Sequence, residues 1–230
     1  MRLALYSYWR SSSSWRVRIG LHWKGIPFEY RAVDLREGVQ FGDVHGARNA
    51  MHQVPVLEVE EDGVVHHLAQ SMAILQWLEE RFPSPALLPA DAYGRARVRM
   101  LAEHVNSGIQ PYQNQAVLKW LQEQRTGLAL EWVQHWLRQG LEALEHAVAY
   151  GAGNFCHGHS PSLADLYLVP QLYGARRFGV GVDAWPTLKR IERACQELPA
   201  FARAAPLAQP DAPAAPAAQP DAPAPAAERS

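Results

Sequence analysis

The sequence predicts an α/β domain followed by an all-helical domain. Up to about residue 90, apolar residues recur at spacings of two and of three to four, a pattern typical of short strands alternating with helices. Beyond Asp91 only the helical spacing remains. We therefore expect a first domain over residues 1–84, a helical domain over residues 91–207 and a tail over residues 208–230.

The strands of the first domain follow from alternation and from turn residues. A strand is expected at Arg2–Ser7, where Leu3 and Leu5 lie on one side. Residues 28–35 are also β-like, and another strand is expected directly after Pro55. The predicted order is βαβ, a linking segment, and then ββα.

Two helices are expected between these strands and after them. The serine cluster after Arg10 can cap a helix that ends near Gly25. A second helix is expected from Ser71, because Ile74 and Leu78 then lie on one apolar face. Ser71 itself is expected to be the N-cap of that helix.

The second domain is expected to be helical throughout. Apolar residues between Leu128 and Val148 follow helical spacing over about five to six turns. Residues 91–125 are predicted to form another helix or a pair of helices. Ser162 and Asp165 have the spacing of a capping box, with Asp in place of the usual Glu, which marks a further helix start.

The tail is defined by its composition. Residues 208–230 contain ten Ala and six Pro, include the block AQPDAP twice, and hold no apolar side chain larger than Ala. Such a segment buries too little surface to offset its ordering entropy, so we expect it to be disordered.

Composition excludes several classes of protein. The 230 residues are 48% apolar and 20% charged with a net charge of -1, which is typical of a globular protein and leaves no broad basic surface for nucleic acid or anionic lipid. No stretch approaches the ~18 apolar residues of a membrane span, and the N-terminus lacks a signal-peptide core. Cys156 and Cys195 are too few for a disulfide framework. We expect a cytoplasmic protein with neither a nucleic-acid nor a membrane partner.

The ten histidines do not indicate a metal centre. His66 and His67 are adjacent, and His157 and His159 are close, but no Cys or carboxylate set at ligand spacing accompanies either pair. No metal site is expected.

The tract from Arg10 to Arg18 is the first candidate binding site. It contains four serines and three arginines at a strand-to-helix turn, where a hydroxyl, free backbone N–H groups and the helix dipole can hold an anion. Composition alone favours a serine-rich cap and loop with no ligand.

Two further patterns lie where strands and helices meet. Pro55 opens a strand after Gln53 and Val54, and a cis bond there would turn the backbone of Val54 outward to pair with a peptide-like ligand. Gln70 and Ser71 precede a helix, whose first turn is a second candidate anion site. Each pattern is weak alone, but their order along the chain is informative.

Taken together, these motifs resemble the zeta class of cytosolic glutathione transferases. The stretch YWRSSSSWRVRIGL is similar to the zeta-class signature, whose usual form reads SSCSWRVRIAL. Further matches are HQVPVLEV, AQSMAILQWLEERFPSP, LLPADAYGRARVRM, SGIQPYQNQAVLKWL, SLADLYLVPQL and ARRFGV. The resemblance covers Met1 to about Asp211. It implies a thioredoxin-like N-terminal domain, an all-α C-terminal domain, and the activity of a maleylacetoacetate isomerase or the related maleylpyruvate isomerase.

The resemblance also implies roles for individual residues. Ser11 matches the residue whose hydroxyl stabilises the glutathione thiolate, and Arg10 and Arg177 match arginines near the substrate carboxylates. Val54 would bond the cysteinyl backbone of glutathione. Gln70 and Ser71 would hold the γ-glutamyl group. The remaining glutathione contacts implied by position are Ser12, Ser13, Ser14, Trp15, Arg16, Gln40, Gln110, Asn114, Gln115 and Ala116.

The implied mechanism is reversible thiolate addition. Addition of the thiolate turns the cis double bond into a single bond, and its expulsion after rotation leaves the trans isomer. Free thiols have a pKa of about 8.5, so hydrogen-bond donors and a helix dipole that lower it raise the reactive fraction. Ser11 would act as a hydrogen-bond donor and not as the nucleophile, while arginines would bind the dicarboxylate and stabilise the developing enolate.

One departure from the family signature bears on the chemistry. Ser13 stands where the zeta signature has Cys, so no protein thiol lies in the predicted site. This weakens dehalogenation through a mixed disulfide and leaves isomerisation by glutathione alone. The motif QPYQNQ is closer to maleylacetoacetate isomerases, whereas LLPADA and ARRF are closer to bacterial maleylpyruvate isomerases, so both substrates stay open.

Two alternative functions are also considered. One is general conjugation or dehalogenation of small electrophiles such as α-haloacids by the same thiolate. The other is a non-catalytic binding protein of the same fold, against which the intact Ser11, Gln70 and Ser71 argue. For partners, the resemblance implies a small dicarboxylate substrate and a homodimer.

Overall fold

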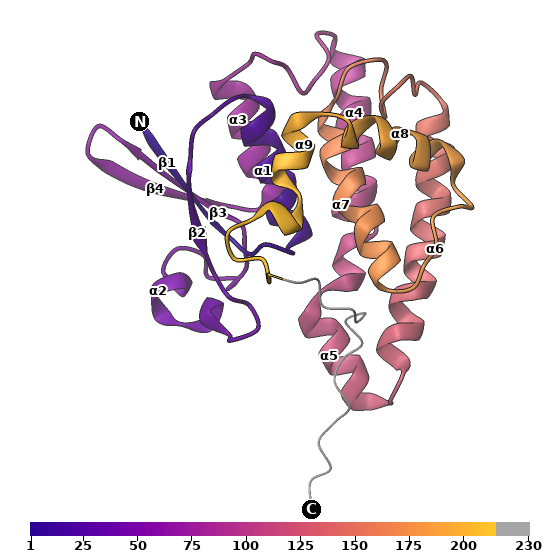
Figure 1. The fold of residues 1–230 in the computed structure, drawn as a ribbon, viewed down its shortest axis with the longest axis horizontal. Helices are drawn as coiled ribbons and strands as arrows, with labels where there is room; N and C mark the ends of the chain where they lie inside the picture. Colours follow the sequence, from indigo (N-terminus) through magenta and orange to yellow (C-terminus); the bar gives the residue numbers. More distant parts are fainter. Residues whose placement is uncertain (215–230) are drawn as a thin grey trace, which may run out of the picture. The chain divides into compact units, whose positions relative to one another are not determined.

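The computed structural model describes residues 1–214, which divide into two compact units (Figure 1). Of the described residues, the first unit contains Met1–Leu88 and residues 196–214, and the second contains Pro89–Cys195. The expected α/β domain followed by helices is confirmed. None of the helices within residues 1–214 is long and apolar enough to cross a membrane.

A four-stranded mixed sheet forms the centre of the first unit, in the order β2-β1-β3-β4. Its strands are β1 (Arg2–Ser7), β2 (Glu29–Ala32), β3 (Val56–Glu61) and β4 (Val64–Ala69). β1 runs parallel to β2 and antiparallel to β3, and β4 is antiparallel to β3. The expected strand at residues 28–35 is shorter than its sequence pattern, since only four of its residues pair with β1.

The first unit contains the two expected helices and two helices that the sequence did not predict there. They are α1 (Ser12–Trp23), α2 (Asp43–Gly46), α3 (Ser71–Arg81) and α9 (Pro199–Ala204), with short 3-10 turns η1 (Val39–Phe41) and η3 (Pro206–Ala208). α1 packs against both α3 and α9. The chain reverses after α1 at Gly25, whose φ of 67° is one that glycine adopts without strain.

The second unit is all-helical, as predicted. It contains α4 (Ala92–Asn106), η2 (Gln110–Gln113), α5 (Gln115–Gln124), α6 (Leu128–Ala149), α7 (Leu163–Arg177) and most of α8 (Pro186–Gln196). α4 packs against α7 and α6, and α5 packs against α6. α6 buries Val133, Leu137 and Leu141 along the stripe that its sequence spacing predicts.

The C-terminal boundary differs from the expected one. Residues 196–207 were expected in the helical domain, but residues 196–214 cluster with the first unit. The expected disordered tail also begins too early at residue 208, because Asp211 accepts hydrogen bonds from Trp9 and Tyr30 and thereby fixes residues 208–214. The rest of the expected tail, residues 215–230, lies outside the described residues.

The capping box at the start of α7 is built around a fully buried carboxylate. Asp165 accepts hydrogen bonds from the N–H and the hydroxyl of Ser162, each at 2.8 Å, and from the N–H of Cys156, also at 2.8 Å. The three donors compensate for the removal of this side chain from water. Burial nevertheless raises the pKa of Asp165.

We expect Asp165→Ala to lower the free energy of unfolding by about 3 kcal/mol, because it leaves several buried donors without an acceptor. Urea denaturation of the purified protein measures the change. Asp183→Ala is the matched control, since Asp183 is exposed and pairs with Lys189 at the surface, and it should change stability by less than about 1 kcal/mol. Equal losses in the two variants would contradict this account of Asp165.

Candidate active site

The register of the sheet brings three predicted motifs to one end of the first unit. Tyr6 of β1 pairs with Val56 of β3, and Val56 pairs with Ala69 of β4. The chain therefore leaves β1, enters β3 and leaves β4 at the same edge of the sheet (Figure 1). The motifs that contain Ser11, Val54 and Gln70 lie directly beyond these three strand ends.

Ser11 is the N-cap of α1. Its extended backbone (φ -63°, ψ 118°) lets Oγ accept a hydrogen bond from the Ser14 N–H at 3.2 Å. Within residues 1–214, no hydrogen bond uses the N–H groups of Ser12 and Ser13. The positive end of the helix thus keeps free donors beside the Ser11 hydroxyl, which is the arrangement that binds anions.

The serine tract divides into an accessible part and a buried part. Arg10, Ser11, Ser12 and Ser13 are half-buried, whereas the side chains of Ser14, Trp15 and Arg16 face the interior. Trp15 is 6% exposed and Arg16 is 1% exposed. The glutathione contacts expected for these last three residues remain predictions.

Val54 presents its backbone beside this helix start. The Val54-Pro55 peptide bond is cis, as considered from the sequence, and β3 begins only at Val56. Within residues 1–214, no hydrogen bond uses the N–H or the C=O of Val54. The preceding Gln53 is held firmly, because its C=O accepts hydrogen bonds from His45 Nε2 and Asn49 Nδ2, both at 3.0 Å.

Gln70 and Ser71 form the start of α3. Gln70 has φ 70° and ψ 117°, a backbone conformation rare for a side-chain-bearing residue and one that clusters at ligand sites. The prediction that Ser71 is the N-cap is wrong by one position, since Gln70 is the N-cap and Ser71 is the first helical residue. The buried Ser71 Oγ accepts a hydrogen bond from Arg16 Nη1 at 3.2 Å, which ties the start of α3 to α1.

Gln40 lies in η1, next to the chain that leads to Val54. Its C=O accepts a hydrogen bond from His52 Nδ1 at 2.9 Å, and its side chain is 8% exposed. Among residues 1–214, no partner contacts its buried Oε1. A buried polar atom without a partner is expected to be completed by a ligand or by water.

A buried arginine fixes the turn between β1 and α1, and sequence reasoning missed it. Arg18 donates to Ser7 Oγ at 3.0 Å, to the C=O of Tyr8 at 3.3 Å and to the C=O of Trp9 at 2.8 Å. Burial lowers the pKa of Arg18 to about 10. The available signal was an arginine placed between Val17 and Ile19 on a helix with little polar surface.

The other predicted site residues belong to the second unit. Gln110 begins η2, where Tyr112 stacks on Trp136 with ring centroids 4.5 Å apart. Asn114 is the N-cap of α5 and accepts a hydrogen bond from the Ala116 N–H at 2.9 Å. Gln115 and Ala116 are exposed at the first turn of that helix.

The two adjacent arginines at the end of α7 differ in environment. Arg176 forms a two-pronged ion pair with Glu192, with distances of 2.7 and 2.5 Å, and this hydrogen bonding raises its pKa. Arg177 is half-buried, and its guanidinium lies 5.9 Å from the centroid of the Phe178 ring. The ion pair gives Arg176 a structural role, whereas Arg177 remains the predicted substrate contact.

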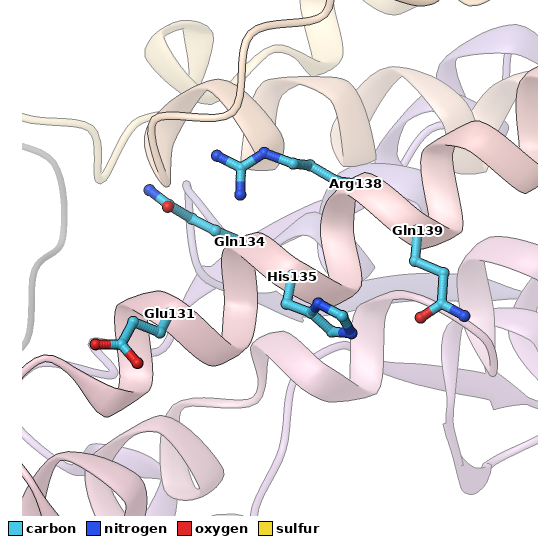
Figure 2. Close-up of a pocket in the computed structure, with 5 residues that line it drawn as sticks. All are labelled: Glu131, Gln134, His135, Arg138 and Gln139. Carbon is cyan, nitrogen blue, oxygen red and sulfur yellow. The ribbon is translucent and has the colours of Figure 1, made fainter.

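A separate hollow of about 670 Å³ lies along one face of α6 (Figure 2). None of the predicted site residues lines it. Two of its side chains already have protein partners, since Gln134 donates to the C=O of Phe178 at 2.8 Å and Glu131 pairs with Arg125 at 2.6 Å. Its lining residues are Glu131, Gln134, His135, Arg138 and Gln139.

The fold and the site define a glutathione transferase. The family model described as "Glutathione S-transferase, N-terminal domain" matches residues 10–81, the part of the chain that carries Ser11, Val54 and Gln70. The sheet order and the helical second unit agree with that fold.

Comparison with known proteins shows which glutathione transferases this chain resembles. The chain is 44% identical to the maleylpyruvate isomerase of a Ralstonia species, over 91% of this chain and 99% of that protein. It is 44% identical to the maleylacetoacetate isomerase of Pseudomonas aeruginosa, over 92% of this chain and 99% of that protein. A maleylacetoacetate isomerase from Anaeromyxobacter dehalogenans, with glutathione bound in its active site, is 62% identical with a TM-score of 0.87, covering 92% of this chain and 98% of that one.

The chain belongs to the zeta-class glutathione transferase family, which includes the maleylacetoacetate and maleylpyruvate isomerases. The family resemblance and the fold predicted from the sequence are confirmed. The individual contacts predicted for Ser11, Val54, Gln70 and the residues of the second unit remain predictions.

Proposed function

We propose that this protein is a glutathione-dependent cis-trans isomerase that converts maleylacetoacetate or maleylpyruvate to its fumaryl isomer in the catabolism of aromatic compounds. The observation that carries the proposal is the edge of the sheet at which the Ser11 hydroxyl, the start of α1 and the backbone of Val54 come together. These groups suit a peptide-like ligand that bears an anionic sulfur.

The residues at this edge fit glutathione group by group. The N–H and C=O of Val54 can pair with the cysteinyl backbone as one strand pairs with another. The start of α3, with Gln70 and Ser71, can hold the γ-glutamyl carboxylate, since a helix N-terminus favours negative charge. The buried side chain of Gln40 offers a further hydrogen-bonding group.

Ser11 is suited to donate a hydrogen bond to a thiolate. Its Oγ accepts from the Ser14 N–H, and a hydroxyl that accepts one hydrogen bond still has its own proton to donate. The N–H groups of Ser12 and Ser13 add positive potential at the same place. Together these donors favour the anionic form of a bound thiol and so lower its pKa.

When bound, glutathione supplies a thiolate whose reversible addition to the cis double bond permits rotation about that bond. Arg10 and Arg177 are proposed to bind the carboxylates of the substrate, because a guanidinium can hold a carboxylate through two parallel hydrogen bonds. A cation near the conjugated carbonyl also stabilises the negative charge that develops there. Ser13, which replaces the family cysteine, leaves the site without a protein thiol.

The first test is an absorbance assay of the purified protein with maleylpyruvate and with maleylacetone, each with and without glutathione. We expect rapid conversion of at least one substrate only when glutathione is present, and the faster substrate identifies the pathway. Chloroacetate serves as a comparison electrophile, and we expect it to react much more slowly. Glutathione binding without turnover of either maleyl substrate would contradict the proposal and favour conjugation or dehalogenation, whereas absence of glutathione binding would favour a non-catalytic protein.

Ser11→Ala should remove most of the turnover while the protein remains folded. Loss of the N-cap costs about 1 kcal/mol of stability, which a folded domain tolerates, and loss of the donor raises the pKa of the bound thiol. Steady-state kinetics and thermal unfolding measure the two effects. Ser107→Ala, at the exposed end of α4, is the control and should retain full activity. Turnover close to wild type in Ser11→Ala would contradict the assigned role.

We also propose a cytoplasmic homodimer. Both cysteines are buried free thiols, which suits a reducing compartment. In the first unit, Val64 and Val65 lie on the edge strand β4 and are 51% and 49% exposed, and in the second unit Tyr93 on α4 is 73% exposed. Exposed apolar side chains of this size are typical of surfaces that associate.

Sedimentation equilibrium should give twice the chain mass of 25.7 kDa. Burying a carboxylate in an apolar interface is energetically costly. Val65→Glu should therefore shift the monomer–dimer equilibrium toward the monomer. Val117→Glu is the control, because Val117 is likewise an exposed apolar residue, on α5. A monomer at micromolar wild-type concentration would contradict the dimer.

A further inference from the structure

The last described segment of the chain packs on the turn that carries Arg10 and Ser11. At the end of α9, the C=O of Ala204 accepts a hydrogen bond from Arg18 Nε at 3.0 Å. Ala212 packs against a buried cluster that contains Tyr8, Trp9 and Val54. This late segment of the chain thus packs against a cluster that contains both the start of the turn and Val54.

Asp211 makes the polar contacts of this segment. Its Oδ2 accepts a hydrogen bond from the backbone N–H of Trp9 at 2.9 Å, and its Oδ1 accepts one from the Tyr30 hydroxyl at 2.7 Å. Gln209 anchors the segment, because its side-chain amide donates to the C=O groups of Arg203 and Ala205 at 2.8 and 2.9 Å. Each oxygen of the Asp211 carboxylate therefore accepts a hydrogen bond from a different donor, and the two bonds together fix the orientation of the carboxylate.

The turn between β1 and α1 is held from both sides by charged groups. Asp211 accepts from the Trp9 N–H, while Arg18 donates to the C=O groups of Tyr8 and Trp9. The C=O of Tyr8 also accepts from the Ser11 N–H at 3.0 Å, which closes the turn. With these peptide groups fixed, the direction of the Ser11 hydroxyl and of the first N–H groups of α1 is determined before any ligand binds.

We propose that Asp211 is a positioning residue for the active-site turn: its carboxylate fixes Trp9 and thereby preorganises Arg10 and Ser11 for the thiol and the substrate. The inference rests on the proposed function for its effect on catalysis, but its structural part can be measured without glutathione. Preorganised donors stabilise developing charge without reorganisation during the reaction, so a loosened turn lowers the rate more than it weakens binding.

The experiment compares Asp211→Ala with Asp211→Asn in the full-length chain. We expect Asp211→Ala to raise amide hydrogen exchange in peptides covering residues 8–15 of the ligand-free protein and to lower kcat by about tenfold with little change in KM. The pKa of bound glutathione, followed by the ultraviolet absorbance of its thiolate, should rise. Asp211→Asn should restore most of each property, because an amide can accept from the Trp9 N–H and donate to the Tyr30 oxygen.

Two further variants make the test decisive. Tyr30→Phe removes the hydrogen bond to Asp211 Oδ1, together with the hydrogen bond between Tyr30 and the Ser7 side chain, but keeps the one from the Trp9 N–H. It should raise exchange at residues 8–15 by a smaller amount, and this variant decides the question if Asp211→Ala fails to fold. Asp183→Ala, at an exposed position of the second unit, should leave exchange at residues 8–15 unchanged.

Several outcomes would overturn the inference. These are wild-type exchange at residues 8–15 in both Asp211→Ala and Tyr30→Phe, exchange raised equally throughout the first unit, or equal defects in the Ala and Asn variants. If the wild-type protein shows no glutathione binding or turnover, the proposed function fails, and the exchange measurements still decide whether Asp211 fixes the turn.

Discussion

The buried guanidinium of Arg18 is the interaction on which the geometry of the first unit depends. A charge removed from water must be surrounded by acceptors, and Arg18 finds them in Ser7, in the turn that follows β1, and in Ala204 at the end of α9. One side chain therefore fixes the end of a strand, the entry of a helix and the returning chain. Because the turn that it fixes carries Ser11, this buried guanidinium also helps to orient the proposed chemistry.

The sheet supplies the second constraint, since its register decides which loops meet. A shift of one residue between β1 and β3 would move every side chain to the opposite face and would separate Val54 from the Ser11 turn. The buried residues of β1 and β3 exclude such a shift. The packing of the hydrophobic core thus also determines where the polar groups of Ser11 and Val54 lie.

Sequence reasoning predicted what depends on local pattern and missed what depends on distant contacts. The limits of β1, α3 and α6 follow from periodicity and capping, and the serine tract and the Val54-Pro55 pair are motifs that neighbours in the chain define. Arg18 and Asp211 are different, because their partners lie up to 202 positions away. Composition predicted disorder from residue 208, yet a single carboxylate within reach of two donors is enough to fix the segment around it.

Both units use charged side chains that are buried or partly buried to fix backbone groups. In the second unit, Asp165 collects the N–H groups of Cys156 and Ser162 and so fixes the start of α7, the helix that ends at Arg177. In the first unit, Arg18 and Asp211 collect the carbonyl and N–H groups of the turn at Ser11. Many of the partners of these charged groups are backbone groups, whose positions follow from the path of the chain. Hydrogen bonds from a charged side chain to backbone groups therefore fix the position of the functional residue that is next to those groups in the chain.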